Sequence, residues 1–205
     1  MQRIGIMGGT FNPPHKGHIA IAEAAQKFYL LDKVIFVPSG HPPHKTHEFI
    51  ADKEDRYKMV KLAIKGHKHF SPSRVEIDRP GYSYAVDTFN DLKKEYKGNA
   101  LLYYIMGMDS INEILSWKKP LELFKICQFI VATRPGARIR TLKRLLKFPP
   151  LKLHAGQIHV IEVKKNISAT KIRESIKKGN IPARLLDNKV AGYIRKKKLY
   201  GYTGI

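Results

Sequence analysis

Apolar residues recur along the chain in two alternating patterns: short continuous runs, and longer stretches with an apolar residue every three or four positions. The short runs predict strands at residues 3–7, 34–37, 74–77, 101–106, 126–133 and 157–163. The longer stretches predict helices at residues 17–30, 53–65, 84–96, 168–178 and 188–197. For the basic, proline-containing residues 137–156 we expect only a helix and a loop. Such an alternation predicts an α/β fold, a doubly wound parallel sheet of the Rossmann-like type with helices on both faces.

Length and composition predict one domain over residues 1–205. The chain has 205 residues, of which 43% are hydrophobic, and this is enough to bury a core. No apolar run approaches the roughly 20 residues needed to cross a bilayer, and residues 1–7 resemble a first strand more than a signal peptide. Cys127 is the only cysteine and lies in an apolar run, which predicts a buried, inert thiol. Together these features predict a cytoplasmic protein without membrane contact.

The charge is strongly positive, with 38 basic residues against 17 acidic ones and a net charge of +21. Such a charge suggests either nucleic-acid binding or an enzyme whose substrates are polyanions. Lysine is spread over the whole chain, with dense runs only at 177–178 and 195–198, and no pattern of stacking aromatic residues accompanies it. We therefore expect small anionic substrates and do not expect nucleic acid to be the physiological ligand.

The segment 8–18 joins the first predicted strand to the first predicted helix. Its sequence is Gly8-Gly9-Thr10-Phe11-Asn12-Pro13-Pro14-His15-Lys16-Gly17-His18. The two leading glycines let the backbone approach a ligand closely, and the helix start favours a phosphate. Thr10 adds a hydroxyl, Lys16 adds charge, and His15 and His18 lie three residues apart at the helix entry, so both can face one point. The alternative is that these histidines only cap the helix in solvent. The segment is neither a Walker loop nor a dinucleotide fingerprint.

A second polar segment, at residues 166–173, precedes and begins a predicted helix. Its sequence is Asn166-Ile167-Ser168-Ala169-Thr170-Lys171-Ile172-Arg173. Ser168 is a suitable N-cap residue. Together with Thr170 and Arg173 it would place two hydroxyls and a guanidinium around a helix N-terminus, which suits a polyphosphate. From these residues alone, an ordinary capped surface helix is an equally good interpretation.

Both segments together resemble the nucleotidyltransferase superfamily of the His-x-Gly-His type, and specifically its bacterial nicotinate-nucleotide adenylyltransferases. The resemblance extends over essentially the whole chain. Further matching segments are residues 37–45, Arg56-Tyr57, residues 81–84 with Asp87-Thr88, residues 106–110, Trp117, residues 134–136 and residues 190–200. The resemblance implies a nucleotidyltransferase fold in which the C-terminal helical part, about residues 166–205, completes the ATP site.

The resemblance also implies a reaction and a set of site residues. The family transfers AMP from ATP to nicotinate mononucleotide, with Mg²⁺ bound through the ATP phosphates, and forms deamido-NAD and pyrophosphate. His15 and His18 are the implied catalytic residues, with His18 nearest the reacting α-phosphate. The implied ATP-binding residues are Gly8, Gly9, Thr10, Phe11, Lys16, Gly107, Asp109, Arg134, Ile167, Ser168, Thr170 and Arg173. The implied residues for the mononucleotide are His44, Lys45, Tyr84, Ala85 and Trp117, with Trp117 stacking on the pyridine ring.

The chain departs from the family pattern at two positions. Asn12 stands where the family most often has Asp; it keeps a cap and loses a charge, so we expect activity to survive. Ala85 stands where the family usually has Thr near the pyridine ring, which weakens the assignment of the acceptor more than that of adenylyl transfer. Nicotinamide mononucleotide, or another phosphate-bearing acceptor, is therefore the alternative substrate.

Three further expectations complete the sequence interpretation. His41, His44 and His47 are evenly spaced, but the prolines between the first two argue against a shared helix face, so we expect no protein-built metal site. A homo-oligomer is compatible with the sequence. A basic nucleic-acid-binding protein on the same fold is the alternative of a different class. It would bind DNA or RNA with a steep salt dependence and release no pyrophosphate from ATP.

Overall fold

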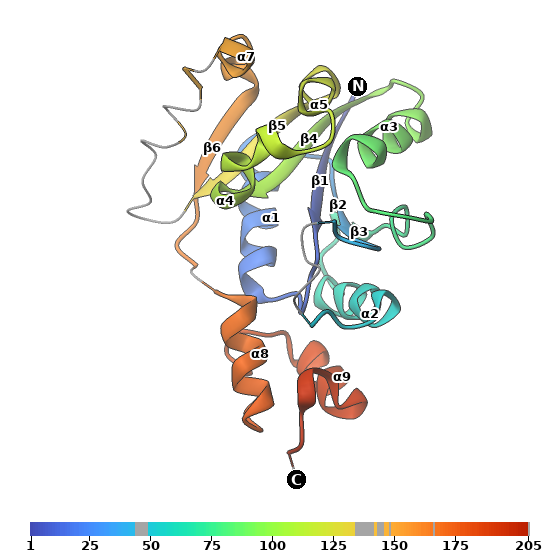
Figure 1. Cartoon of the computed structure of the whole chain (residues 1–205), viewed down its shortest axis with the longest axis vertical. Helices are drawn as coiled ribbons and strands as arrows, with labels where there is room; N and C mark the ends of the chain where they lie inside the picture. Colours follow the sequence, from blue (N-terminus) through green and yellow to red (C-terminus); the bar gives the residue numbers. More distant parts are fainter. Residues whose placement is uncertain (44–48, 134–141, 143–145, 148, 166, 205) are drawn as a thin grey trace.

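The core of the molecule is one six-stranded parallel sheet in the strand order β3-β2-β1-β4-β5-β6 (Figure 1). The computed structural model describes all residues except 44–48, 134–141, 143–145, 148, 166 and 205. The strands are β1 (Gln2–Gly9), β2 (Lys33–Pro38), β3 (Phe70–Pro72), β4 (Ala100–Gly107), β5 (Cys127–Thr133) and β6 (Ile158–Glu162). The doubly wound parallel sheet predicted from the apolar pattern is confirmed.

Helices connect the strands and cover both faces of the sheet. The α-helices are α1 (Lys16–Tyr29), α2 (Lys53–Ala63), α3 (Ala85–Glu95), α4 (Met108–Asn112), α5 (Pro120–Ile126), α7 (Pro149–Lys152), α8 (Ala169–Lys177) and α9 (Asn188–Lys197). Short 3-10 helices span Ile114–Ser116, Ala155–Gln157 and Leu199–Gly201. In the part of the chain that the structure describes, no helix is both long and apolar enough to span a membrane.

Two hydrophobic layers enclose the sheet, one on each face. On one face, side chains of α3 and α5, such as Phe89 and Phe124, pack against Ile6 and Phe129 of the strands. On the other face, α1 and α2 pack against the strand residues that alternate with those of the first face. Because successive strand residues point to opposite faces, strands buried on both sides are continuously apolar. This explains why the strands were visible as uninterrupted apolar runs.

The strand predicted at residues 74–77 is wrong. The third strand is β3 (Phe70–Pro72), which pairs with β2 at the edge of the sheet, and an edge strand tolerates a proline. Residues 75–77 instead form a turn, closed by a 2.9 Å hydrogen bond from the Asp78 N–H to the Arg74 carbonyl. Ile77 and Glu76 are nevertheless buried. The apolar pattern therefore indicated burial in the protein interior and not a strand.

Between β4 and β5 the chain forms three short helices that the sequence pattern did not predict: α4, the 3-10 helix Ile114–Ser116, and α5. Each has seven residues or fewer, which is too short to show a helical period. α5 begins at Pro120, a favourable first position of a helix. These helices fix the position of Trp117, which follows the 3-10 helix.

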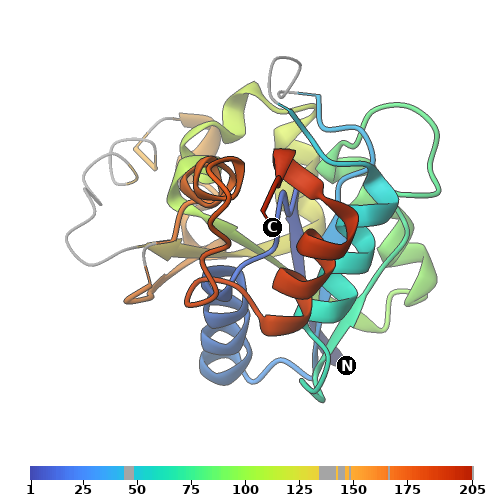
Figure 2. The same cartoon turned by 90° about the horizontal axis from the view of Figure 1, so that it is seen from below.

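The C-terminal helices α8 and α9 lie beyond the carboxyl ends of the central strands, with α9 next to α2 (Figures 1 and 2). They share a third hydrophobic cluster with α2, in which Ile172, Ile176 and Ile194 pack around Met59. A hydrogen bond of 2.7 Å from the Tyr193 hydroxyl to Asp55 also joins α9 to α2. The C-terminal segment is thereby held at the edge of the sheet where the glycine-rich turn of β1 ends.

Candidate active site

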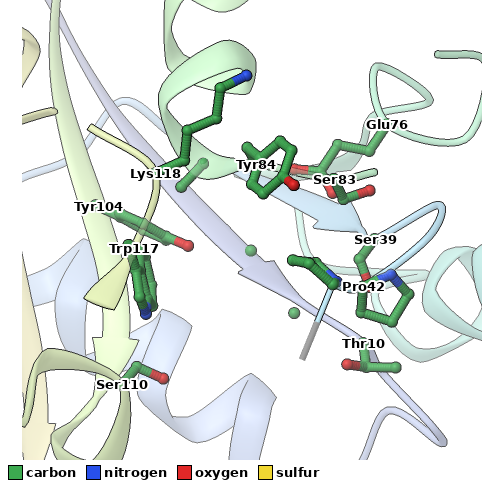
Figure 3. Close-up of a pocket in the computed structure, with 14 residues that line it drawn as sticks. Thr10, Ser39, Pro42, Glu76, Ser83, Tyr84, Tyr104, Ser110, Trp117 and Lys118 are labelled. Atoms are coloured by element: carbon green, nitrogen blue, oxygen red, sulfur yellow. The ribbon is translucent and has the colours of Figure 1, made fainter. Parts of the chain in front are cut away.

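The sheet changes its winding direction between β1 and β4, which are hydrogen-bonded neighbours. In open α/β sheets, ligands bind at the carboxyl ends of the strands at this point. A pocket opens there and is lined by six of the predicted residues: Gly8, Gly9, Thr10, Tyr84, Ala85 and Trp117. Figure 3 shows Trp117 and Tyr104 on one side of the pocket and Thr10, Ser39 and Pro42 on the other. The fold thus brings residues of β1, of the segment after β2, of α3 and of the β4–β5 connection to one cavity.

His15 and His18 form a stacked pair at the start of α1. Their ring centroids are 3.7 Å apart, and the backbone N–H of His15 donates to Nδ1 of His18 at 3.1 Å. Because Nδ1 accepts this bond, the neutral ring of His18 carries its proton on Nε2. Burial, and secondarily the nearby His15, holds the pKa of His18 well below its usual value. His18 is therefore a neutral N–H donor at pH 7, suited to an oxygen on which charge develops.

At Gly17, between the two histidines, there is no room for a side chain. A Cβ at this position would lie 2.9 Å from Nδ1 of His15 and 3.4 Å from Cβ of Ile167. Any side chain would therefore displace the His15 ring or the segment before α8. The alternative that the two histidines merely cap the helix in solvent fits poorly, because His15 is only 8% exposed.

Three neighbours of the histidines have specific positions. The ring of Phe11 is buried and meets His18 edge-on at 5.0 Å, so only the backbone of Phe11 can reach a nucleotide. Thr10 lines the pocket. The Lys16 amine donates to the carbonyl of Ala183 at 3.4 Å, so in this structure it is directed to the loop before α9.

The two polar segments of the sequence meet in space. Arg173 donates from Nη1 to the carbonyl of Asn12 at 3.0 Å and from Nη2 to the Thr170 hydroxyl at 3.3 Å. Ser168 caps α8, since its hydroxyl accepts the N–H of Lys171. The predicted N-cap is confirmed. The N-terminus of α8 thus faces the same region as the start of α1. The two bring hydroxyls, a guanidinium and helix N–H groups together, a donor set that suits a polyphosphate.

The end of β4 provides a second open position beside β1. Apart from its two chain neighbours, no described residue has an atom within 4 Å of a Cβ built on Gly107, so the backbone there is accessible to a ligand. Asp109 is exposed in the first turn of α4, whose N-cap is Gly107, so Asp109 does not cap that helix. Of the remaining predicted site residues, His44, Lys45 and Arg134 lie outside the described residues.

Trp117 forms the aromatic wall of the pocket. Its ring packs against Tyr104 of β4, with centroids 6.0 Å apart. Next to it, the Lys118 amine bonds to Asp87 at 2.8 Å and lies 4.6 Å from the centre of the Tyr84 ring. The half-buried indole thus presents a flat surface bordered by a cation.

A buried carboxyl group, that of Glu76, closes the far side of the pocket. The hydroxyls of Thr88 and Ser83 donate to it, the first at 2.6 Å. Burial raises the pKa of this carboxyl. The Ser83 hydroxyl in turn accepts the N–H of Gly40 at 2.9 Å, which fixes the end of β2. The sequence interpretation missed Glu76 as a site residue because it placed residues 74–77 in a strand.

Other lining residues were also missed, namely Ser39, Tyr104, Ser110 and Lys118. The Ser39 hydroxyl is buried without a hydrogen-bond partner among the described residues. A buried hydroxyl of this kind usually finds a partner in water or a ligand. A position directly after a strand was the available sequence signal for Ser39. Tyr104 gave no such signal, because it lies within an apolar run.

Asn12, a departure from the family pattern, forms hydrogen bonds through both the nitrogen and the oxygen of its side-chain amide. Nδ2 donates to the Phe49 carbonyl at 2.8 Å, and Oδ1 accepts the N–H of Ala51 at 3.1 Å. The side chain is 4% exposed. Asn12 therefore attaches the segment before α2 to the glycine-rich turn, and an aspartate could accept from Ala51 but could not donate to Phe49.

We expect Asn12→Asp to destabilise the protein. It leaves a carboxylate oxygen against the Phe49 carbonyl in a buried position, which costs about 1–3 kcal/mol and lowers Tm by a few degrees. Thermal unfolding followed by circular dichroism measures the change. Asn99→Asp, an exposed site with the same change of charge, is the control and should leave Tm unchanged. An equal Tm for Asn12→Asp and the parent would show that the Asn12 amide donates no important bond.

A family model described as cytidylyltransferase-like matches residues 6–175 of the chain. The chain belongs to this family. A probable nicotinate-nucleotide adenylyltransferase of Moorella thermoacetica is 46% identical over 199 residues, which cover 97% of this chain and 91% of that protein. One of the same name from Thermoanaerobacter sp. is 45% identical, with coverage of 97% and 94%. The resemblance inferred from the two polar segments is confirmed.

Solved structures of the cytidylyltransferase-like family share the fold of this chain. Nicotinic acid mononucleotide adenylyltransferase of Plasmodium falciparum, complexed with NaAD, aligns with a TM-score of 0.80 over 99% of both chains at 20% identity. The same enzyme complexed with APC aligns with a TM-score of 0.77. At this identity the likeness concerns the fold. Together with the relatives, these matches identify this cytidylyltransferase-like protein as a nucleotidyltransferase.

Proposed function

We propose that the protein transfers the adenylyl group of ATP to nicotinate mononucleotide, forming deamido-NAD and pyrophosphate in NAD biosynthesis. The observation that carries this proposal is the meeting of residues 8–18 with the N-terminus of α8, beside a pocket with an indole wall. One part suits a triphosphate, and the other suits a planar ring. Relatives that cover nearly the whole chain bear the name of this activity.

The chemistry of the site fits a displacement at phosphorus. The mononucleotide phosphate has a second pKa near 6 and is mostly dianionic at neutral pH, so no general base is needed. One of its oxygens attacks the α-phosphorus of ATP, the bond from that phosphorus to the bridging oxygen breaks, and pyrophosphate leaves. Catalysis then consists of aligning two anions and stabilising the charge on the transferring group. His18 donates at the α-phosphate, while Ser168, Thr170 and Arg173 hold the β- and γ-phosphates.

Magnesium is proposed to bind through the ATP phosphates. Among the described residues, no three His, Cys, Asp or Glu side chains gather to hold a metal ion. The residues at the proposed phosphate site are donors, namely imidazole, hydroxyl and guanidinium groups. This donor set fits an ion held mainly by phosphate oxygens and water, as is usual for Mg²⁺. When bound, the ion would neutralise charge on the leaving pyrophosphate.

The pocket favours an acid over an amide on the pyridine ring. It lies beside the N-terminus of α3, which begins at Ala85, and free N–H groups with a positive dipole at a helix start favour an anion. Lys118, at the same end of the pocket, is paired with Asp87 at 2.8 Å, so the helix N–H groups carry this preference. They compensate for the hydroxyl that Ala85 lacks.

Release of pyrophosphate tests the function directly. With ATP and Mg²⁺, we expect kcat/KM for nicotinate mononucleotide to exceed that for nicotinamide mononucleotide. Release should stop with EDTA and return with excess Mg²⁺. A preference for the amide would overturn the assignment of the acceptor, and no release with any phosphate-bearing acceptor would overturn adenylyl transfer.

Replacing Trp117 with alanine is expected to raise KM for the mononucleotide about 10-fold, since stacking on an aromatic ring contributes ~1–3 kcal/mol per base. KM for ATP should change less than about twofold. Steady-state kinetics with each substrate varied in turn measures both. Phe28→Ala, which removes an exposed aromatic ring of α1 that does not line the pocket, should change neither. Equal increases for both substrates would show that Trp117 only packs against Tyr104.

A further inference from the structure

Arg56 of α2 is the largest fully buried side chain in the described part of the molecule, with an exposure of 1%. Arginine is almost never fully buried unless it is paired. Among the described residues, its guanidinium donates four hydrogen bonds, each to a backbone carbonyl. The acceptors are Ala51 at 2.9 Å from Nε, Thr10 at 2.9 Å and Ser39 at 2.6 Å from Nη1, and Gly40 at 3.0 Å from Nη2.

The four carbonyls belong to three separate segments that surround the pocket. Thr10 follows β1, Ser39 and Gly40 follow β2, and Ala51 precedes α2. Thr10 and Ser39 both line the pocket. A single guanidinium therefore connects the turn that precedes the histidine pair to the wall at the end of β2, and joins both to the start of α2.

Such an arrangement is costly for stability alone. Burial lowers the pKa of Arg56, which reflects the cost of placing a charge away from water. Apolar side chains of similar volume often stabilise a protein as well as a buried charge does. Apolar side chains cannot form hydrogen bonds, whereas the guanidinium has N–H donors in a rigid planar arrangement that can fix several carbonyls relative to one another.

We propose that Arg56 is a positioning residue for adenylyl transfer. This inference rests on the proposed function. Its guanidinium fixes Thr10, which follows the glycine-rich end of β1, relative to Ser39 and Gly40, which follow β2; Thr10 and Ser39 both line the pocket. Each substrate keeps its own contacts when Arg56 is replaced, but the two are no longer aligned for attack. A displacement of about 1 Å can lower a rate on the order of 100-fold.

The expected signature is a loss of kcat without a loss of binding. In Arg56→Gln and Arg56→Ala we expect kcat to fall about 10- to 100-fold. The Kd values of a non-hydrolysable ATP analogue and of nicotinate mononucleotide, each measured alone by calorimetry, should change less than about threefold. Arg56→Lys keeps the charge but not the fork, so it should fold and still lose most of kcat. Arg74→Gln, at an arginine whose side chain is 40% exposed and bonds Glu54 and Asp78, is the control and should keep parent kcat.

A purely structural role predicts a different result. It would reduce the fraction of active sites, measured by titration with a tight-binding inhibitor, and leave kcat per active site unchanged. Guanidinium ion at low millimolar concentration should partly restore kcat of Arg56→Ala, and methylammonium should not. If Arg56→Ala does not fold, the same kinetic and binding measurements on Arg56→Lys decide the question.

Two outcomes overturn the inference: parent kcat per active site in Arg56→Lys and Arg56→Gln, or Kd values that rise in parallel with the loss of kcat. A parent enzyme without turnover on ATP and nicotinate mononucleotide would instead overturn the proposed function. The two failures are therefore distinguishable.

Discussion

Replacing His18 with alanine is expected to lower kcat about 100-fold or more, the scale of losing one preorganised donor to a transition state. The structure gives the reason in the hydrogen bond from the His15 N–H to Nδ1 of His18. This bond fixes the ring and places the proton on Nε2, which we propose donates to the α-phosphate. Because burial keeps the ring neutral, no charged group is lost, and KM for ATP should change much less than kcat.

Steady-state pyrophosphate release measures this effect, and His67→Ala is the matched control. His67 lies between α2 and β3, where it contacts Glu23 and Phe70, so its removal should leave kcat unchanged. Near-parent turnover in His18→Ala would remove His18 from the reaction. A fall in kcat matched by an equal loss of active sites would show that the ring mainly supports Phe11.

The second large effect is expected for Gly40→Ala. A Cβ at Gly40 would lie 2.2 Å from the backbone carbonyl oxygen of Glu76, so the end of β2 or the 75–77 turn must move. Overpacking of this kind costs about 1–3 kcal/mol, which lowers Tm by about 2–10 °C in a chain of this size. Gly40 also donates to Ser83 and accepts from Arg56, so the displacement reaches the pocket and kcat/KM should fall with Tm.

Gly192→Ala tests whether the effect comes from the close contact. Gly192 lies inside α9, and apart from its chain neighbours and the backbone of its own helix, no described residue has an atom within 4 Å of its Cβ position. Alanine there should raise stability by up to about 1 kcal/mol, because it is the better helix former. Calorimetric unfolding of both variants should therefore show Tm changes of opposite sign. A Gly40→Ala variant as stable as the parent would mean that the turn around Glu76 can move to make room for the Cβ at no cost in stability.

Much of the fold was predictable because its signals are local. Strands buried on both faces are continuous apolar runs, and helices such as Asn188–Lys197 have a regular apolar stripe. The prediction failed where an element is too short to show a period, as in α4 and α5, and where burial occurs without a strand, as in residues 75–77.

The candidate site was predictable to the extent that its residues lie in contiguous motifs. Residues 8–18 and 166–173 could each be recognised because a phosphate site can be built from one turn and one helix N-terminus. The residues that shape the pocket from separate segments were not recognised. Glu76, Ser39 and Tyr104 each contribute one side chain from a different element, and a single side chain leaves no spacing pattern.

The sequence by itself determined the fold class, the family and the two polar segments that we propose bind phosphate. Glycine next to histidine at a helix entry, and serine at a helix cap, have direct local consequences for the backbone. Only the tertiary structure decided that these segments meet through Arg173 and Asn12. It also decided that Arg56 connects three chain segments around the pocket. A buried arginine bound to backbone carbonyls depends on where distant segments end, and the residue types of those segments do not specify this.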